Sequence, residues 1–396
     1  MLRIKDSLGT EPITFHYMNA LEDRLEIRDF VLAHSALGID TESTGLNCYR
    51  GNWQLRTMQV GNANHSYVIP AANRGLIRWI MKQPMNWIGH NGPHDIRCID
   101  SFLGYETGVT CAGETYLPAH YSDSRPASEG GIGHGLKEQA IAHISRDAGK
   151  WEVALKKVFK QIEIPIPGAI YKSGKRKGQP RMRKARLAEG WGLIDLTNPV
   201  YIAYAAADPL LTYRLWKYYQ PVVKQFHELY QFDKAVQLAA DKLNRRAMLL
   251  DRRYTQRLDD AYMRKAGVFI DQAAEFGCAN INSGQQIAAT IAALGGRLTT
   301  RTPTGQYKTD DKILRGLVAA CGGEYSPVKD FIHCVLGAKQ LLKRRENYTQ
   351  AMLREVDERG RVHPSINTMG ARTTRMSVSG PPLQQLPTSD READAE

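Results

Sequence analysis

Four carboxylates and one phenol are the side chains of this sequence best suited to act together in catalysis. Asp40 and Glu42 are separated by one residue in the segment 35–42, which alternates as a β-strand does, so both acids lie on one face about 7 Å apart. Leu37 and Ile39 lie on the opposite face. Two like charges at this spacing repel each other unless a cation lies between them. The pair therefore indicates a cation site, although an isolated Asp-x-Glu more often belongs to a solvated sheet edge.

Asp95 is the third acid, and it falls in the first turn of a predicted helix. The segment 86–91 is typical of a short buried strand, and Gly92-Pro93 then begins a helix, because proline is tolerated at the first helical position. The helix dipole stabilises an acid in this turn. Asp95 taken alone therefore has an ordinary structural explanation.

Tyr204 and Asp208 are four residues apart in an alanine-rich helix that begins at Pro199. Side chains at this spacing project from one face of a helix and can touch. Taken singly, Tyr204 fits a core-edge aromatic residue and Asp208 a surface acid. A strand with Asp-x-Glu, then Asn-x-x-x-Asp, then Tyr-x-x-x-Asp is much more specific than any one of these parts.

These three segments resemble the motifs of the DEDDy 3′→5′ exonucleases, and they span Asp40–Leu46, His90–Asp95 and Tyr204–Asp208. Ser43 stands where the first motif usually has threonine, and His94 where the second usually has an aromatic residue. Ala203 occupies the position at which the DEDDh branch has a histidine. The resemblance is therefore to the tyrosine branch.

The resemblance implies two-metal hydrolysis of the 3′-terminal phosphodiester, with two Mg²⁺ ions as cofactors and Mn²⁺ as the alternative. It implies that Asp40 bridges both ions and that Glu42 and Asp208 hold the ion on the nucleophile side. Asp95 would hold the other ion through water. Tyr204 would orient the attacking water, because a phenol with a pKa of about 10 is a weak acid and not a strong base.

The second half of the chain resembles the thumb and the start of the palm of family A (polymerase I type) DNA polymerases, in particular their phage branch. The segments that carry this resemblance are 280–287, 301–309 and 339–348 for the thumb, and 361–368, 372–377 and 381–387 for the palm. We therefore expect an α/β ribonuclease-H-like exonuclease domain at 1–224 and a mostly α-helical thumb-like domain at 225–361. An incomplete palm segment with an acidic tail would follow at 362–396.

The polymerising carboxylates, the fingers helix and the primer-end motif of that family have no match before Glu396. We therefore expect no polymerase active site in these 396 residues. The chain would then belong to a split, interrupted or truncated polymerase. Ile366, Met369 and Leu383 would then expose apolar surface and lead either to binding of a separate chain that carries palm and fingers or to disorder. An alternative function is a DNA-binding or assembly subunit with little activity of its own, and a weaker one is an RNA-processing exonuclease.

A basic stretch at 172–186 holds eight basic residues in fifteen and no acid, with glycine and proline among them. This composition predicts a loop that follows the phosphate backbone of DNA, although a solvated insertion has the same composition. The expected partners are single-stranded 3′ ends and primer–template duplex. The candidate DNA-binding residues are Leu46, Asn91, Lys175, Arg176, Lys177, Arg181, Arg183, Lys184, Asn282, Ser283, Arg372 and Arg375.

The composition fits a nucleic-acid enzyme of two or three domains, with 42% hydrophobic residues and a net charge of +12. The six cysteines lack zinc-ligand spacing, and no signal peptide or membrane-length apolar segment occurs. We therefore expect a cytoplasmic protein, in a bacterial host if it is phage-encoded, with no membrane partner. The predicted elements are strands at 13–17, 55–60 and 65–69, and helices at 21–32, 135–144, 151–162 and from 199 onwards.

Overall fold

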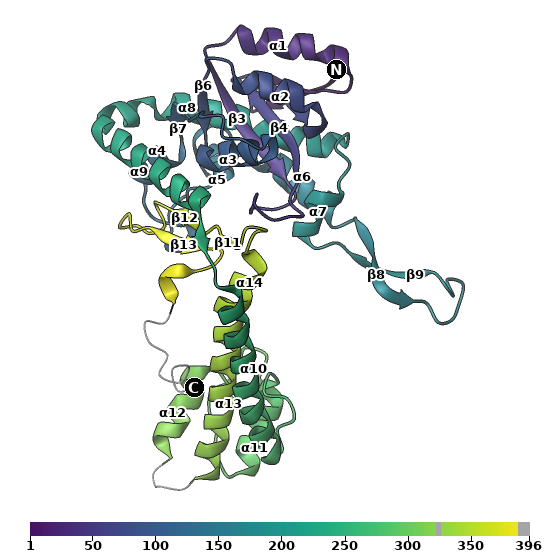
Figure 1. Ribbon diagram of the computed structural model, residues 1–396, viewed down its shortest axis with the longest axis vertical. Helices are drawn as coiled ribbons and strands as arrows, with labels where there is room; N and C mark the ends of the chain where they lie inside the picture. Colours follow the sequence, from purple (N-terminus) through teal and green to yellow (C-terminus); the bar gives the residue numbers. More distant parts are fainter. Residues whose placement is uncertain (322–325, 387–396) are drawn as a thin grey trace. The chain divides into compact units, whose positions relative to one another are not determined.

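The computed structural model describes residues 1–321 and 326–386, and the predicted acidic tail at 387–396 lies outside this part (Figure 1). The chain divides into two compact units. Unit 1 comprises residues 1–246 and 366–377, and unit 2 comprises the rest. Within the described residues, no helix is both long and apolar enough to cross a membrane.

Unit 1 is built on a seven-stranded mixed sheet with the order β1-β2-β5-β4-β3-β6-β7. The strands are β1 (Leu2–Leu8), β2 (Glu11–Tyr17), β3 (Ala36–Ser43), β4 (Leu55–Gly61), β5 (His65–Pro70), β6 (Asn86–Gly89) and β7 (Gly113–Glu114). The predicted strands and the β4–β5 hairpin are confirmed. β1 was not predicted, because it pairs only with β2 at the sheet edge and most of its side chains are exposed.

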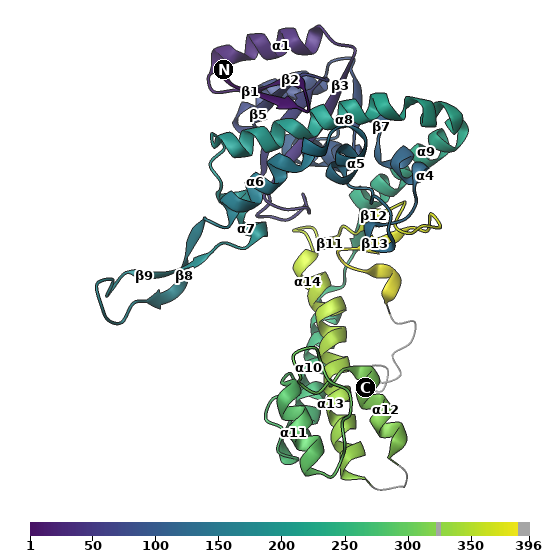
Figure 2. The ribbon, with the colours of Figure 1, turned by 180° about the vertical axis from the view of Figure 1, so that it is seen from behind.

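Helices cover both faces of this sheet (Figures 1 and 2). They are α1 (Arg24–Leu32), α2 (Arg74–Met81), α3 (Gly92–Leu103), α4 (Tyr116–Ser122), α5 (Leu136–His143), α6 (Lys150–Phe159), α7 (Leu187–Leu193), α8 (Pro199–Gln225) and α9 (His227–Arg246). Leu37 and Ile39 pack in the core that includes α1, α2 and α3. Phe15 and Val68 pack in the core that includes α5, α6 and α8. Because side chains alternate along a strand, Asp40 and Glu42 face away from Leu37 and Ile39, as predicted.

The start of helix α8 and its packing against β3 both follow from the residues at those positions. Asn198 Oδ1 accepts a hydrogen bond from the Val200 amide at 2.9 Å, and Pro199 occupies the first helical position. Further along, α8 approaches β3 so closely that a Cβ on Gly38 would overlap the backbone carbonyl of Pro209. Glycine at position 38 therefore allows the approach that brings Asp208 beside the strand.

Residues 172–179 of the basic stretch contain no strand, as predicted for a loop, but residues 180–184 form a strand that the composition did not predict. Residues on either side of its tip form an antiparallel hairpin of β8 (Glu163–Ile170) and β9 (Pro180–Lys184), which extends away from the sheet in both views (Figures 1 and 2). The Tyr171 amide also donates to the Gln179 carbonyl at 3.0 Å. Most of the hairpin's side chains are exposed. Neither face is buried, and Pro165 and Pro167 in β8 disfavour a strand in the sequence, so the pairing was not predicted.

Unit 2 begins at residue 247 and is mainly helical, and the prediction of a mostly helical region after the sheet is confirmed. Its elements are β10 (Met248–Leu249), α10 (Arg252–Glu275), α11 (Gly284–Ala293), α12 (Asp311–Ala320), α13 (Pro327–Arg344), a π-helical stretch at Arg345–Gln350, α14 (Ala351–Glu355) and β11 (Arg361–Val362). Phe331 and Val335 of α13 are fully buried together with Ile287 and Ile291 of α11. β10 and β11 pair antiparallel.

The segment 362–386 contains β12 (Ser365–Asn367) and β13 (Ser377–Ser379), which form a two-stranded sheet. Within unit 1, Met369 is only 4% exposed and packs with Leu117, Val223 and Tyr230. The expectation that Met369 exposes apolar surface is therefore wrong. Residues of unit 1 itself cover Met369, which the sequence did not indicate.

Candidate active site

Three of the predicted metal ligands lie together. Carboxylate oxygens of Asp40, Glu42 and Asp208 are all within 4.8 Å of one another. Asp40 and Glu42 come from β3, and Asp208 comes from α8. Glu42 is 8% exposed and Asp208 6% exposed, so the cluster is largely shielded from water.

Burial and mutual repulsion make this cluster costly without a cation. Burial raises the pKa of Asp40 to about 7. Burial raises the pKa of Glu42 well above its usual range, and the neighbouring charges of Asp40 and Asp95 raise it further. A divalent cation would relieve both effects, and an all-oxygen ligand set fits Mg²⁺ or Mn²⁺.

The Asp95 carboxylate lies outside the 4.8 Å cluster. Its Oδ1 accepts a hydrogen bond from Thr41 Oγ1 at 2.7 Å, and the side chain is 5% exposed. Burial raises the pKa of Asp95 well above its usual range, and the charge of Asp40 adds to this shift. Asp95 is therefore near enough to Asp40 to interact with it electrostatically, and Thr41, which the sequence did not single out, positions it.

Tyr204 lies on α8 in electrostatic contact with the cluster. Burial raises its pKa well above 10, and the charges of Glu42 and Asp40 raise it further. Its ring centroid is 5.6 Å from that of Trp191. The hydroxyl therefore stays protonated near neutral pH, which suits a group that orients a water molecule and does not remove a proton.

Lys137 is a member of the site that the sequence analysis missed. Its ammonium group forms an ion pair with Asp208 Oδ1 and lies 4.7 Å from the centroid of the Tyr204 ring. Burial lowers the pKa of Lys137 to about 8, although the charges of Asp40 and Glu42 oppose the shift. In the sequence, Lys137 is one lysine near the start of a predicted helix, and nothing there distinguishes it from a surface lysine.

Glu114 was also missed, and it holds the turn that carries Asn91. Asn91 has a left-handed backbone conformation, with φ of 65°. The Glu114 carboxylate accepts hydrogen bonds from the amides of Asn91 at 2.7 Å, Gly92 at 2.8 Å and Tyr116 at 2.9 Å. Burial raises its pKa to about 7, although these hydrogen bonds favour the charged form. Glu114 therefore fixes the start of α3, on which Asp95 lies.

His94 replaces the usual aromatic residue of the second motif, and its ring contacts its own helix. Its nitrogens lie 3.3 Å from an Arg97 guanidinium nitrogen and 3.6 Å from Cys98 Sγ. Burial lowers the pKa of His94 to about 4, and the Arg97 charge lowers it further, so the ring is neutral near neutral pH. His94 thus serves the packing of α3.

The candidate DNA-binding residues near the cluster and on the hairpin differ in whether they are exposed or already form ion pairs. Leu46 is 86% exposed, and Asn91 is also exposed. On the hairpin, Arg183 pairs with Glu189 at 2.7 Å and Lys184 with Glu163 at 2.8 Å. The other four hairpin candidates are exposed, and they are Lys175, Arg176, Lys177 and Arg181.

Four candidates lie in the second half of the chain. Ser283 is the N-cap of α11, where its hydroxyl accepts a hydrogen bond from the Gln286 amide at 3.3 Å, and Asn282 beside it is exposed. Arg372 is exposed and pairs with Glu129 at 3.3 Å, and Arg375 is exposed.

Two family models match the chain. Residues 16–115 match the family described as 3′-5′ exonuclease, and residues 251–395 match DNA polymerase family A. The chain belongs to the family A DNA polymerases. It corresponds to the N-terminal part of such a polymerase and carries its exonuclease domain.

Similar polymerases come from phages and bacteria. The DNA polymerase of Mycobacterium phage D29 is 28% identical over 400 residues, which cover 98% of this chain and 62% of that protein. The DNA polymerase of Mycobacterium phage L5 is 27% identical over 399 residues, with the same coverage of 98% and 62%. DNA polymerase I of Chloroflexus aurantiacus is 31% identical over 284 residues, 66% of this chain and 28% of that protein. The chain thus spans 62% of the length of the two phage polymerases.

A solved structure shares the fold of this family A polymerase chain. It is the POL domain of Pol1 from M. smegmatis, in complex with a DNA primer-template and dNTP. The TM-score is 0.59 at 14% sequence identity, and the match covers 96% of this chain and 57% of that chain. At this identity the match shows the fold alone.

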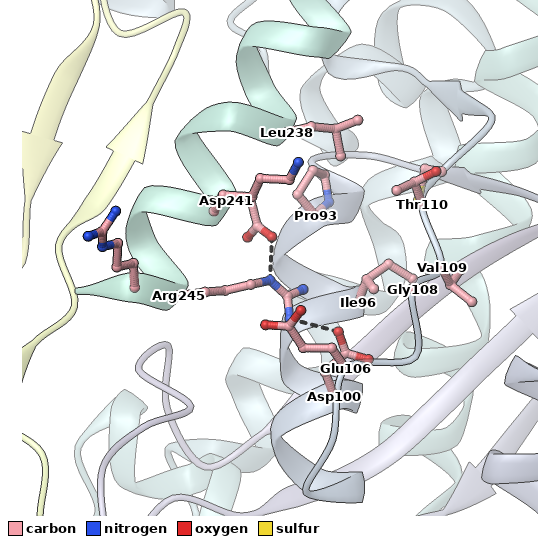
Figure 3. Close-up of a pocket in the computed structure, with 13 residues that line it drawn as sticks. Pro93, Ile96, Asp100, Glu106, Gly108, Val109, Thr110, Leu238, Asp241 and Arg245 are labelled. Carbon is pink, nitrogen blue, oxygen red and sulfur yellow. Dashed lines mark hydrogen bonds and ion pairs between the residues drawn. The ribbon is translucent and has the colours of Figure 1, made fainter. Parts of the chain in front are cut away.

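A separate cavity of about 490 Å³ lies between α3, the segment 106–111 and α9 (Figure 3). Arg245 reaches from α9 to Asp100 of α3 at 2.7 Å, and it also pairs with Asp241 of its own helix at 2.6 Å. Arg97 of α3 forms a further ion pair with Asp241. These ion pairs join α9 to α3, and none of the motif carboxylates lines the cavity.

Proposed function

We propose that unit 1 is a metal-dependent 3′→5′ exonuclease acting on DNA, the proofreading activity of a family A DNA polymerase. The observation that carries the proposal is the buried group of Asp40, Glu42 and Asp208, whose oxygens lie within 4.8 Å of one another. The match of residues 16–115 to the 3′-5′ exonuclease family supports it.

The donor set supports two Mg²⁺ ions, with Mn²⁺ as the alternative. Asp40, Glu42 and Asp208 would hold the ions directly, and Asp95 through water. Bound ions of this kind activate a water and stabilise the charge of the reacting phosphate. The protonated Tyr204 hydroxyl would orient that water. Leu46, apolar and 86% exposed, would pack against the terminal base, and Asn91 would contact the terminal nucleotide.

The β8–β9 hairpin would supply sequence-independent affinity for DNA. Basic side chains bind phosphates and release counter-ions whatever the base sequence is. The exposed tip, Lys175 to Lys177 with Arg181, is better placed for this than Arg183 and Lys184, which already pair with glutamates. The tip would bind the strand leading to the cluster.

The rest of the functional assignment follows the same family. Residues 1–224 would form the ribonuclease-H-like exonuclease domain, 225–361 the thumb and 362–396 part of the palm. Asn282, Ser283, Arg372 and Arg375 would bind primer–template duplex. A separate chain with palm and fingers is a proposed partner, and the cytoplasm of a bacterial host is the proposed location, as for a phage polymerase.

The decisive experiment removes two carboxylates of the cluster. Asp40→Ala combined with Glu42→Ala should reduce hydrolysis of a single-stranded DNA oligonucleotide by about 1,000-fold or more, because metal ions contribute several kcal/mol to such reactions. Binding of Mn²⁺, followed by calorimetric titration, should be lost as well. An RNA oligonucleotide of the same sequence tests the choice of DNA over RNA.

The matched control is Glu22→Ala combined with Asp29→Ala, which removes two exposed acids of unit 1. It makes the same change in net charge and should leave both hydrolysis and Mn²⁺ binding as they are. Undiminished nuclease in the cluster variant would place the activity elsewhere and contradict the proposal.

A further inference from the structure

Lys137 occupies a position that is unfavourable for a cation in two respects. Its side chain is only 13% exposed, so the ammonium group has lost most of its hydration. Lys137 is also the second residue of α5 (Leu136–His143), where the helix dipole disfavours a positive charge. A lysine in this position is stable only if nearby negative charges compensate for both costs.

The carboxylate cluster provides that compensation. The Lys137 ammonium pairs with Asp208 Oδ1 and interacts with the charges of Asp40 and Glu42. It also lies 4.7 Å from the centroid of the Tyr204 ring, in a cation–π contact. The same ammonium thus contacts both functional residues of α8, at the place where the three acids come together.

We propose that Lys137 is the internal counter-ion of the carboxylate cluster and that its ammonium competes with a divalent cation for Asp208. The inference rests on the proposed function, because it takes Asp40, Glu42 and Asp208 to be the metal ligands. Lys137 holds the three acids together when no metal is bound. It therefore preserves the geometry of the site, and in return it lowers the affinity of the site for metal.

The test is Mn²⁺ affinity, measured by calorimetry on the full chain without DNA. Lys137→Met removes the charge and keeps the length of the side chain. It should bind Mn²⁺ about tenfold more tightly, because a close charge pair in a partly buried site is worth at least that factor. Lys137→Arg keeps the charge and should stay near the wild-type affinity. Equal or weaker Mn²⁺ binding by Lys137→Met would overturn the proposal.

Thermal unfolding gives a second readout that does not depend on activity. In a chelator, Lys137→Met should unfold at a lower temperature than the wild type, because the acids then repel one another without compensation. Saturating Mn²⁺ should reduce this difference in unfolding temperature between Lys137→Met and the wild type. A difference of the same size in both conditions would assign Lys137 a purely structural role and would overturn the proposal. If Lys137→Met does not fold, both measurements are made on Lys137→Gln, which also removes the charge but can still hydrogen-bond to Asp208. The same results are expected for it.

Lys150 offers a matched control. Its ammonium group pairs with Asp6 at 2.9 Å and lies 4.9 Å from the Trp151 ring, so it makes the same two kinds of contact away from the cluster. Lys150→Met should therefore not change Mn²⁺ affinity. If wild-type protein binds Mn²⁺ as tightly as the Asp40→Ala and Glu42→Ala variant does, the proposed function fails. If only Lys137→Met is without effect, the counter-ion proposal alone fails.

Discussion

The carboxylate cluster and the β8–β9 hairpin both concentrate charge of one sign, but they are built in different ways. The cluster joins β3 to α8, which are far apart in the sequence, and its acids are largely buried. The hairpin joins neighbouring segments, and its basic side chains are mostly exposed. Electrostatic effects should therefore be large and sensitive to geometry at the cluster. At the hairpin they should be modest, additive and screened by salt.

Among substitutions that leave the metal-ligand candidates unchanged, Gly38→Ala should disturb the geometry of the cluster most. Its Cβ would overlap the Pro209 carbonyl and push α8 away from β3. We expect about a 100-fold loss of kcat/KM, since displacements of about 1 Å at a catalytic group have effects of this size. Overpacking should also lower the free energy of unfolding in urea by about 1–3 kcal/mol.

Gly75→Ala in α2 is the control, because a Cβ there meets nothing within 4 Å. It should retain full activity. If Gly38→Ala were as active as Gly75→Ala, the close approach of α8 would not be what positions Asp208.

Glu114, a buried acid of unit 1, should make the free energy of unfolding depend on pH, unlike the exposed hairpin residues. Its pKa rises from 4.5 to about 7 on folding. The stability that this group contributes is fully present below about pH 4.5 and is lost as the pH rises through about 7, to a total on the order of 3 kcal/mol. Glu114→Gln should therefore flatten the pH dependence of the unfolding free energy in this window, relative to the wild type. Denaturant unfolding at a series of pH values measures it, and parallel curves for both proteins would rule this role out.

Tyr204→Phe should have a smaller effect on catalysis. The variant loses only the hydroxyl, so we expect kcat to fall about tenfold, less than the ~100-fold typical of a group that transfers a proton. Mn²⁺ affinity should not change. Tyr201→Phe is the control, because the Tyr201 hydroxyl lies 2.7 Å from Thr57 Oγ1 in the core, and its loss should lower stability and leave kcat unaltered. Equal kcat values for the two variants would exclude a role for the Tyr204 hydroxyl.

The hairpin should show the smallest effects, and they should depend on position. Replacing Lys175, Arg176 and Lys177 with alanine should reduce the salt dependence of DNA binding by up to ~0.7 units of log–log slope per lost contact with single strands. Replacing Arg183 and Lys184 should reduce it less, because both pair with glutamates. Fluorescence anisotropy at several salt concentrations compares the two variants. Identical slopes for both would show that the tip has no special part in binding.

The sequence predicted those parts of the site that depend on local pattern. The strand around Asp40, the turn before Asp95 and the helix with Tyr204 and Asp208 follow from alternation, helix-start residues and i,i+4 spacing. The mixed sheet and the helical second half are confirmed for the same reason. These signals lie within a few residues of each element.

The roles of Lys137 and Glu114 could not be predicted from local sequence pattern. Each acquires its role from a tertiary contact, with Asp208 in one case and with the backbone of Asn91 and Gly92 in the other. The hairpin was missed for the opposite reason, since pairing of its backbone requires no buried face and leaves no apolar pattern. Sequence pattern records the burial of apolar side chains and local geometry, whereas these three features depend on tertiary contacts of polar side chains or on backbone pairing.

The distance in sequence between β3 and α8 also has a consequence for synthesis of the protein. Asp40 leaves the ribosome long before Asp208 does, and α8 must emerge and dock on β3 before the three carboxylates meet. A nascent chain that has exposed β3 but not α8 therefore lacks the three-carboxylate cluster. Assembly of the cluster thus waits until most of unit 1 has been synthesised.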